Sequence, residues 1–199
     1  MIDPNANRLP WETLPQHQAA VAVERIGQAL PRIFTDRTVM RGPYMEDFDI
    51  FADLVISERG RYIGGPLTRD GAWDDFIQLT ASWILRGCGL WTVEDQEDKA
   101  VLGFVLLGHE TGDPEPELGF LFTEEAEGKG YAFEAAEKAR NNAWNALSFD
   151  TLVSYIDPEN DRAIKLATRL GAVRDANGDH DGTHCYRYTR PDAPKVPHI

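Results

Sequence analysis

The spacing of apolar residues changes several times along this chain, and each change predicts a helix or a strand. Ala19, Ala22, Val23 and Ile26 recur at the three- and four-residue spacing of an amphipathic helix. Helical spacing of this kind predicts helices over residues 16–30, 47–56, 71–86 and 131–147. Shorter apolar runs, rich in branched or aromatic residues, predict strands over residues 38–41, 90–94, 101–108, 117–122 and 151–156.

Turn-forming residues divide these elements. The polar segment 95–99 joins two strand patterns and predicts an antiparallel hairpin. Asp157 suits an N-cap and Pro158 a first helical position, so we expect a further helix from there to Gly171. Asn-Gly and Asp-Gly pairs over residues 177–182 predict a final hairpin that ends near residue 188.

The order of the elements predicts the fold class. Helices come first, an antiparallel meander follows, and strand, helix, strand, helix and hairpin complete the chain. This order predicts an α+β fold with a mixed, mostly antiparallel sheet and flanking helices, not a doubly wound one. We expect one domain over residues 36–190, an N-terminal helical appendage over 1–35 and a flexible tail over 191–199. The appendage could pack on the domain, mediate a homodimer or form a mobile arm.

The charge of the chain limits its partners. Lys and Arg total 20 against 33 Asp and Glu, which gives a formal net charge of −13. Because binding to nucleic acid depends on clustered cations at the phosphates, a dedicated DNA-binding role is not expected. The acidic surface either steers cationic partners such as amines, or serves solubility alone.

Cysteine content and hydropathy predict the compartment. Cys88 and Cys185 stand in different contexts and do not form a disulfide framework. The N-terminal residues lack the basic and apolar segments of a signal peptide. The longest strongly apolar run, residues 101–107, is far shorter than the roughly 18 residues that a membrane helix requires. We therefore expect a soluble, cytoplasmic protein without a membrane partner.

The most informative segment is a strand, a glycine-containing loop and a helix start. Residues 117–122 are followed by the run Glu127-Gly128-Lys129-Gly130-Tyr131-Ala132. Glycines let a ligand approach the backbone, and a helix start presents unpaired N–H groups at the positive end of its dipole. Such a segment is suited to hold a diphosphate. A plain glycine turn is the alternative. A Walker loop is excluded because Gly-Lys-Ser/Thr does not follow the glycines. A dinucleotide fingerprint is a rival that is disfavoured by Phe133 at its third glycine position and by the preceding meander.

At this point the chain resembles the GNAT superfamily of acyl-CoA N-acetyltransferases, whose loop reads Gln/Arg-x-x-Gly-x-Gly/Ala. The run from Tyr131 to Ala136 is similar to one common in the ribosomal-protein (RimJ/RimL-like) branch. Residues 157–172 are similar to the Asn-x-x-Ser and Leu-Gly-Ala segment of that branch. The resemblance extends over residues 37–190.

The resemblance implies a cofactor, acetyl-CoA, and a place for it. The strands 117–122 and 151–156 would splay apart at the centre of the sheet, and acetyl-CoA would enter the gap. The residues that would hold its pantetheine arm are Phe120, Leu121 and Phe122. The residues whose amides would hold its diphosphate are Gly128, Lys129, Gly130, Tyr131 and Ala132.

Two positions depart from the family pattern. Glu127 stands where the family has Gln or Arg, and an unpaired carboxylate there would repel a diphosphate. Ala163 replaces the Ser that is thought to protonate the departing thiolate in some relatives. A thiolate with a pKa near 8.5 leaves without much proton donation, so direct transfer does not require that Ser.

The resemblance also supplies candidate catalytic residues. An alkylamine with a pKa around 10 must lose a proton before it attacks, and Glu117 is the candidate base. Tyr155 is a substitute proton donor or, alternatively, a packed strand aromatic. Asn160 would hydrogen-bond near the thioester or pantetheine, or it is an ordinary helix-start residue. Asp179, His180 and His184 have the residue types of a metal site, but turn chemistry explains them as well, and no metal is expected.

These observations give a function and an alternative. The first interpretation is an acetyl-CoA-dependent N-acetyltransferase that moves an acetyl group directly to a primary amine, on a protein N-terminus or a small molecule. The alternative is a CoA-binding or protein-interaction module with weakened or lost catalysis, which Glu127 and Ala163 favour.

Overall fold

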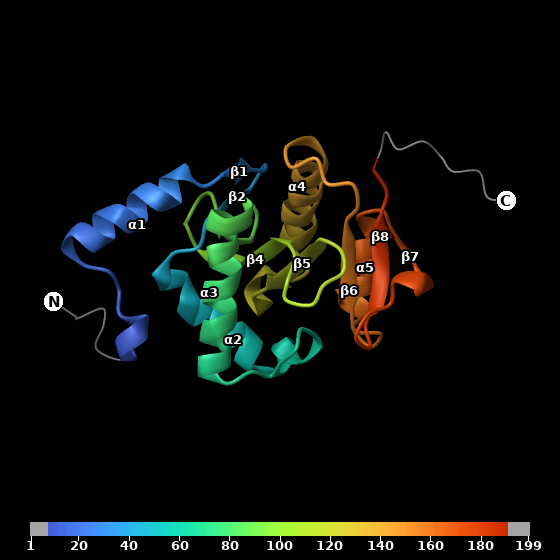
Figure 1. Cartoon of the computed structure of the whole chain (residues 1–199), viewed down its shortest axis with the longest axis horizontal. Helices are drawn as coiled ribbons and strands as arrows, with labels where there is room; N and C mark the ends of the chain where they lie inside the picture. Colours follow the sequence, from blue (N-terminus) through green and yellow to red (C-terminus); the bar gives the residue numbers. More distant parts are fainter. Residues whose placement is uncertain (1–7, 191–199) are drawn as a thin grey trace.

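A single eight-stranded sheet organises the computed structural model, which describes residues 8–190 (Figure 1). The strand order is β1-β2-β3-β4-β5-β6-β8-β7, and every neighbouring pair is antiparallel except β5 and β6. The strands are β1 (Ile33–Phe34), β2 (Thr38–Arg41), β3 (Leu90–Asp95), β4 (Val101–Gly108), β5 (Glu117–Phe122), β6 (Val153–Ile156), β7 (Ala172–Arg174) and β8 (His184–Tyr188). The predicted α+β class and the mostly antiparallel sheet are confirmed.

Five α-helices flank the sheet: α1 (His17–Ala29), α2 (Phe48–Ile56), α3 (Arg69–Arg86), α4 (Tyr131–Asn145) and α5 (Asp161–Arg169). Short 3-10 turns include η1 (Pro10–Glu12), η3 (Glu58–Tyr62), η4 (Glu124–Ala126) and η5 (Ala176–Gly178). Each helix and strand predicted from spacing is present, with ends shifted by a few residues. None of the described helices has the length and apolar character needed to cross a membrane.

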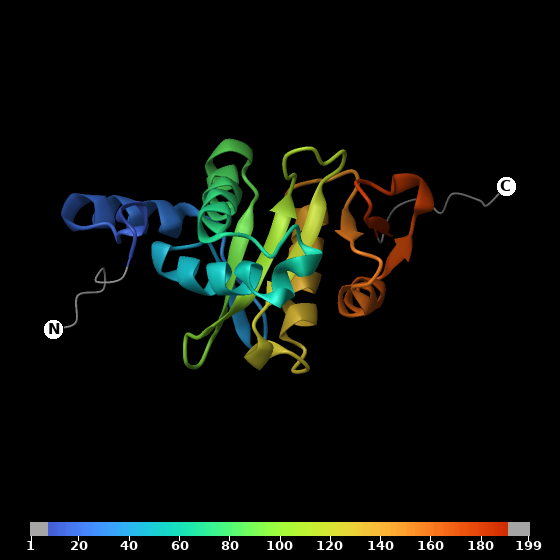
Figure 2. The same cartoon turned by 90° about the horizontal axis from the view of Figure 1, so that it is seen from below.

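The alternation of β4 divides the core into two layers. Phe104 and Leu106 pack with α2 and α3, while Val105 and Leu107 pack with α4. Figure 2 shows α2 and α3 on one face of the sheet and α4 on the other. Aromatic rings dominate the first layer, where Phe51 packs edge-on against Phe104 with ring centroids 5.3 Å apart. Small side chains dominate the second layer along α4, which therefore lies close to the sheet.

The N-terminal segment has two different parts. The fully buried Glu12 forms two hydrogen bonds with Arg69, at 2.7 and 2.8 Å, and thereby ties η1 to α3. By contrast, α1 extends away from the body beside β1 and has no buried residue (Figure 1). A homodimer through this helix stays a prediction, and the tail predicted over 191–199 lies outside the described residues.

Candidate active site

A wedge opens at the centre of the sheet, where β5 and β6 run parallel and separate. Their only paired residues are Glu117 and Val153, at one end. The Val153 N–H donates to the Pro116 carbonyl at 3.1 Å, but the next outward N–H, on Tyr155, donates to a Glu117 carboxylate oxygen at 3.0 Å. A side chain has therefore taken the place of a ladder partner, and beyond it the two strands part.

The edge of β5 that faces the wedge presents backbone groups that pair with no described strand, although the Phe122 carbonyl accepts from Arg59 at 3.3 Å. The Leu118 carbonyl accepts from the Ser154 hydroxyl at 2.5 Å and so points toward β6. Because backbone direction alternates along a strand, the N–H and C=O groups of Phe120 and Phe122 point the same way. No strand pairs with them on this side in the described chain. An extended ligand could pair with them as a strand would.

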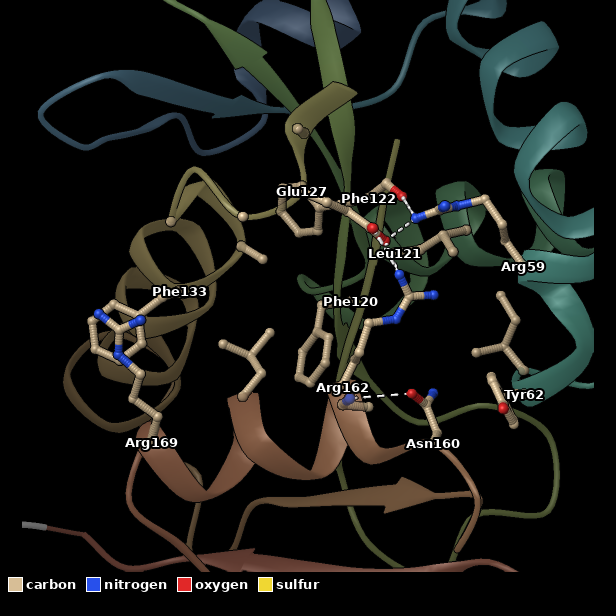
Figure 3. A pocket seen from close by; sticks show the side chains of 17 residues that line it. Arg59, Tyr62, Phe120, Leu121, Phe122, Glu127, Phe133, Asn160, Arg162 and Arg169 are labelled. Atoms are coloured by element: carbon tan, nitrogen blue, oxygen red, sulfur yellow. Dashed lines mark hydrogen bonds and ion pairs between the residues drawn. The ribbon is translucent and has the colours of Figure 1, made fainter. Parts of the chain in front are cut away.

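A cleft of about 360 Å³ follows this edge of β5 and continues to the start of α4 (Figure 3). One wall is β5 with the loop after it, and the opposite wall is α5. The residues that line it are Arg59, Tyr62, Ile63, Phe120, Leu121, Phe122, Ala126, Glu127, Gly128, Gly130, Ala132, Phe133, Asn160, Arg162, Ala163, Leu166 and Arg169.

The start of α4 leaves a run of N–H groups without partners. The first helical bond runs from the Glu134 N–H to the Gly130 carbonyl, at 3.1 Å. Within the described residues, no hydrogen bond is formed by the backbone N–H groups of residues 128–133. Gly128 and Gly130 have φ values of +69° and +85°, a left-handed conformation that glycine adopts without strain. These N–H groups form a concave anion site at the positive end of a 15-residue helix.

Contacts behind the loop fix this anion site in place. Arg37 donates to the Lys129 carbonyl at 3.0 Å and to the Glu134 carboxylate at 2.8 Å. On the sheet side of α4, Ala135, Ala136 and Ala139 are fully buried. The loop is therefore held from both sides, which reduces the ordering cost of binding a ligand.

Asn160 begins α5 at the other wall. Its side-chain oxygen accepts from the Ala163 N–H at 3.1 Å, so Asn160 is the N-cap. The expectation that Asp157 caps this helix and Pro158 starts it was wrong. Asp157 instead accepts from the Glu159 N–H at 2.7 Å in a local turn, and the helix begins at Asp161.

Glu117 lies at the closed end of the wedge. It keeps partial solvent contact, but protein atoms surround its carboxylate. The pKa of Glu117 is raised to about 8, first by burial and then by the negative charges of Glu110 and Asp113, while the hydrogen bond from the Tyr155 N–H acts in the opposite direction. Burial likewise raises the pKa of Glu110 to about 7, together with the charges of Asp113 and Asp75.

Tyr155, on β6, lies beside Glu117 of β5. Its hydroxyl is buried and has no hydrogen-bond partner among the described residues. Burial raises the pKa of Tyr155 to about 12, with smaller contributions from Cys185 and nearby carboxylates. A buried hydroxyl without a hydrogen-bond partner costs about 1–3 kcal/mol of stability.

The family is decided by comparison with known proteins. Residues 37–173, more than half of the chain, match the family model described as the acetyltransferase (GNAT) domain. The chain belongs to the GNAT family. An acetyltransferase structure from Agrobacterium tumefaciens is 34% identical, with a TM-score of 0.78, and covers 81% of this chain and 96% of its own.

Two further relatives agree with the GNAT assignment. The N-acetyltransferase p20 of Bacillus licheniformis, itself described as uncharacterized, is 27% identical over 72% of this chain and 85% of its own length. The structure of RimL, a ribosomal L7/L12 α-N-protein acetyltransferase in complex with coenzyme A, has a TM-score of 0.63. It covers 79% of this chain and 97% of its own at 13% identity, which shows the fold alone.

Within this GNAT fold, most of the predicted cofactor residues meet at the cleft. The lining includes Phe120, Leu121, Phe122, Gly128, Gly130, Ala132 and Asn160. The Tyr131 side chain points elsewhere: its hydroxyl donates to Asp95 at 3.0 Å, and the Arg37 guanidinium lies 4.3 Å from its ring. Tyr131 and Lys129 therefore contribute to the cleft with their backbone N–H groups. Glu117 and Tyr155 lie outside the lining, at the end of the wedge.

Three arginines of the site were not predicted. Arg59 comes from η3, between α2 and α3, while Arg162 and Arg169 come from α5 (Figure 3). Arg59 and Arg162 both bind Glu127. The carboxylate that stands where the family has Gln or Arg is therefore paired. No local motif marks these arginines, because only the folded chain brings η3 and α5 to one cleft.

The predicted turn around Asp179 is confirmed by its contacts. Its carboxylate accepts from Arg174 at 2.6 Å and from the Cys185 N–H at 3.0 Å. Residues 8–190 contain no group of three or more His, Cys, Asp or Glu side chains placed to hold a metal ion.

Proposed function

We propose that this GNAT protein transfers an acetyl group from acetyl-CoA to a primary amine on a cationic acceptor. The observation that carries the proposal is the separation of charge along the wedge. Arginines and unpaired N–H groups lie at the mouth, whereas carboxylates surround the closed end. An anionic cofactor and a cationic acceptor would each meet the complementary charge.

At the mouth, the residues fit a coenzyme that carries phosphates. The N–H groups of residues 128–132 would hold the diphosphate, and the free edge at Phe120 and Phe122 would pair with the pantetheine amides. When bound, acetyl-CoA supplies a thioester whose carbonyl carbon an amine can attack. Asn160 lies across the cleft from β5 and would orient the pantetheine arm.

At the closed end, Glu117 would accept the proton of the incoming ammonium group. A base with a pKa of about 8 has a useful fraction ionised at neutral pH and still binds a proton well. Glu110 and Asp113 would attract the cationic acceptor to this end. The ammonium proton leaves through Glu117 to solvent, and the freed amine forms the N–C bond as the C–S bond breaks. The nitrogen then loses its second proton, which passes through solvent to the departing thiolate.

Tyr155 would act on the departing sulfur by donating a hydrogen bond. With a pKa of about 12, its hydroxyl stays protonated beside a thiolate whose pKa is near 8.5. Full proton transfer is therefore unfavourable, and stabilisation by a hydrogen bond is the role that the chemistry supports. This role compensates for Ala163, which cannot donate.

The acceptor is either a small cationic amine or a protein N-terminus. The likeness of residues 131–136 to the RimJ/RimL-like branch supports the second class, and the RimL relative is named for such an activity. The proposal includes a cytoplasmic reaction. It also includes a catalytic domain over residues 36–190 that carries the N-terminal segment as an appendage.

Release of free thiol from acetyl-CoA tests this proposal. The purified chain would be assayed with polyamines and with peptides that begin with Ser or Ala, each against its N-acetylated form as the control. Thiol release with a free amine, and none with its blocked form, supports the transferase. Saturable CoA binding without turnover on any amine would instead support the alternative, a CoA-binding or protein-interaction module.

A further inference from the structure

An ion-pair bridge crosses the mouth of the cleft. Arg162 donates to both Glu127 oxygens, at 2.6 and 2.7 Å, and Arg59 binds the same carboxylate. Arg59 also donates to the Phe122 carbonyl at 3.3 Å. One carboxylate thus joins three elements: the loop before α4, the start of α5 and η3.

The bridge occupies the path that a ligand would follow. Figure 3 shows the Arg162 side chain rising from α5 toward Glu127, in front of the β5 residues Phe120 and Leu121. All three bridge residues line the cleft. A molecule that extends from the anion site at the start of α4 into the wedge must therefore pass this bridge or displace it.

The charge of the lining is unusual for this chain. The protein has a net charge of −13, yet its cleft is lined by three arginines and one carboxylate, Glu127. The Nη1 atom of Arg162 donates to both oxygens of that carboxylate, and the N–H groups of a guanidinium donate to phosphate oxygens in the same way. Glu127 therefore accepts hydrogen bonds from guanidinium groups that could equally bind a phosphate.

We propose that Glu127 is a placeholder for a cofactor phosphate: it binds Arg59 and Arg162 in the free protein and gives them up when the coenzyme binds. This inference rests on the proposed function. The Glu127 side chain is 35% exposed, and open space surrounds the next residue, Gly128, so the carboxylate can turn to solvent. A diphosphate carries more charge than one carboxylate and replaces it on both guanidinium groups.

The test compares two variants that lose the same charge. Glu127→Gln removes the placeholder, and Glu125→Gln removes an exposed carboxylate two residues away that forms no ion pair within the described chain. Calorimetric titration with CoA should show about three- to tenfold tighter binding for Glu127→Gln, the range expected when partly exposed ion pairs no longer compete. Glu125→Gln should remain within about twofold of the unmodified protein.

Two further titrations identify the phosphate and the partner. If the diphosphate takes over the arginines, Glu127→Gln should also bind dephospho-CoA more tightly than the unmodified protein does. If the 3′-phosphate takes them over, this gain in affinity should vanish with dephospho-CoA. Pantetheine, which has no phosphate, should show no gain in affinity. In an Arg162→Gln background, Glu127→Gln should give a smaller gain, because one of the two competing pairs is already absent.

The outcomes separate this inference from the proposed function. Equal or weaker CoA binding by Glu127→Gln than by Glu125→Gln, with an unmodified protein that binds CoA, overturns the placeholder and leaves the transferase intact. A gain that pantetheine reproduces also overturns it. Failure of every form to bind CoA refutes the proposed function, and the placeholder with it.

Discussion

The backbone N–H of Tyr155 donates to the carboxylate of Glu117 across a distance of 3.0 Å, at the point where β5 and β6 separate. The side chain replaces a β5 carbonyl as the acceptor for β6. The same residue thus satisfies the sheet where it opens and places a carboxylate of raised pKa at the end of the opening. One contact therefore both completes the hydrogen bonding of β6 and positions the proposed base.

Replacing Glu117 by Gln should lower kcat by about 10²- to 10³-fold, because it removes the base while keeping an oxygen for the Tyr155 N–H. CoA affinity should change little, since Glu117 lies outside the cleft lining. The activity of the unmodified enzyme should rise as the pH passes through about 8, the pKa of Glu117. The pH–rate profile of the variant should lack this rise. Glu124→Gln, an exposed change, is the matched control. A pH–rate profile that is the same in both variants would exclude Glu117 as the base.

Glu117 should also make stability depend on pH. Its pKa is about 8 in the folded chain against an ordinary value of 4.5, so the folded state binds this proton more tightly. The stabilisation is complete below about pH 4.5 and is lost as the pH rises to about 8. The free energy of unfolding should fall over this interval, by at most about 1.4 kcal/mol per pH unit from this group. Urea titrations of the protein and of Glu117→Gln should give diverging curves; parallel curves contradict the raised pKa.

Gly130→Glu should weaken CoA binding by at least about 100-fold, because it places a carboxylate in the anion site at the start of α4. Gly182→Glu is the control: Gly182 has a similar φ of +79° against +85° for Gly130, is not among the residues that line the cleft, and has open space where a Cβ would lie. Both variants carry comparable backbone strain and the same charge. If both bind CoA equally well, the diphosphate does not lie on these amides.

Tyr155→Phe should lower kcat about tenfold without loss of stability, because its hydroxyl has no hydrogen bond within the described residues to lose. Tyr188→Phe provides the contrast. The Tyr188 hydroxyl lies 3.0 Å from the Ser154 hydroxyl, so its removal should cost about 1 kcal/mol and change kcat less than about twofold. Thermal unfolding and steady-state kinetics of the two variants measure both effects. Unchanged kcat in Tyr155→Phe would leave Tyr155 as a packed aromatic.

Asp47→Ala should destabilise the fold by about 3–5 kcal/mol, because it leaves a buried guanidinium without its main partner. Asp47 accepts two hydrogen bonds from Arg41, at 2.7 and 3.0 Å, and one from Thr92 at 2.8 Å. Asp53→Ala, on the exposed face of α2, the helix that follows Asp47, should stay within about 0.5 kcal/mol. Equal unfolding midpoints in urea would show that the buried network contributes nothing.

The elements of this fold follow from local patterns, whereas its site depends on distant residues. The spacing of apolar residues is enough to place the helix at Tyr131, since its inner face is a row of alanines. A local rule failed at α5, where both Asp157 and Asn160 are good caps: the Asp157 carboxylate accepts from the Glu159 N–H in a turn, and Asn160 caps the helix. The two-residue strand β1 is too short for a periodic signal.

The same limit applies to the cleft. The glycine loop could be recognised because its residues are consecutive, and its unpaired N–H groups follow from being a helix start. Arg59 and Arg162 are 103 positions apart and meet only through Glu127, so no spacing could have indicated them. The concern about an unpaired Glu127 was therefore removed by tertiary contacts that the sequence does not display.

A crystal structure with CoA is the most direct test of the central claim. We expect the diphosphate within about 3 Å of the Gly130 and Ala132 nitrogens, and the pantetheine arm beside Phe120 and Phe122 in the wedge. A coenzyme bound elsewhere, with β5 and β6 unoccupied between Glu117 and the start of α4, would contradict it.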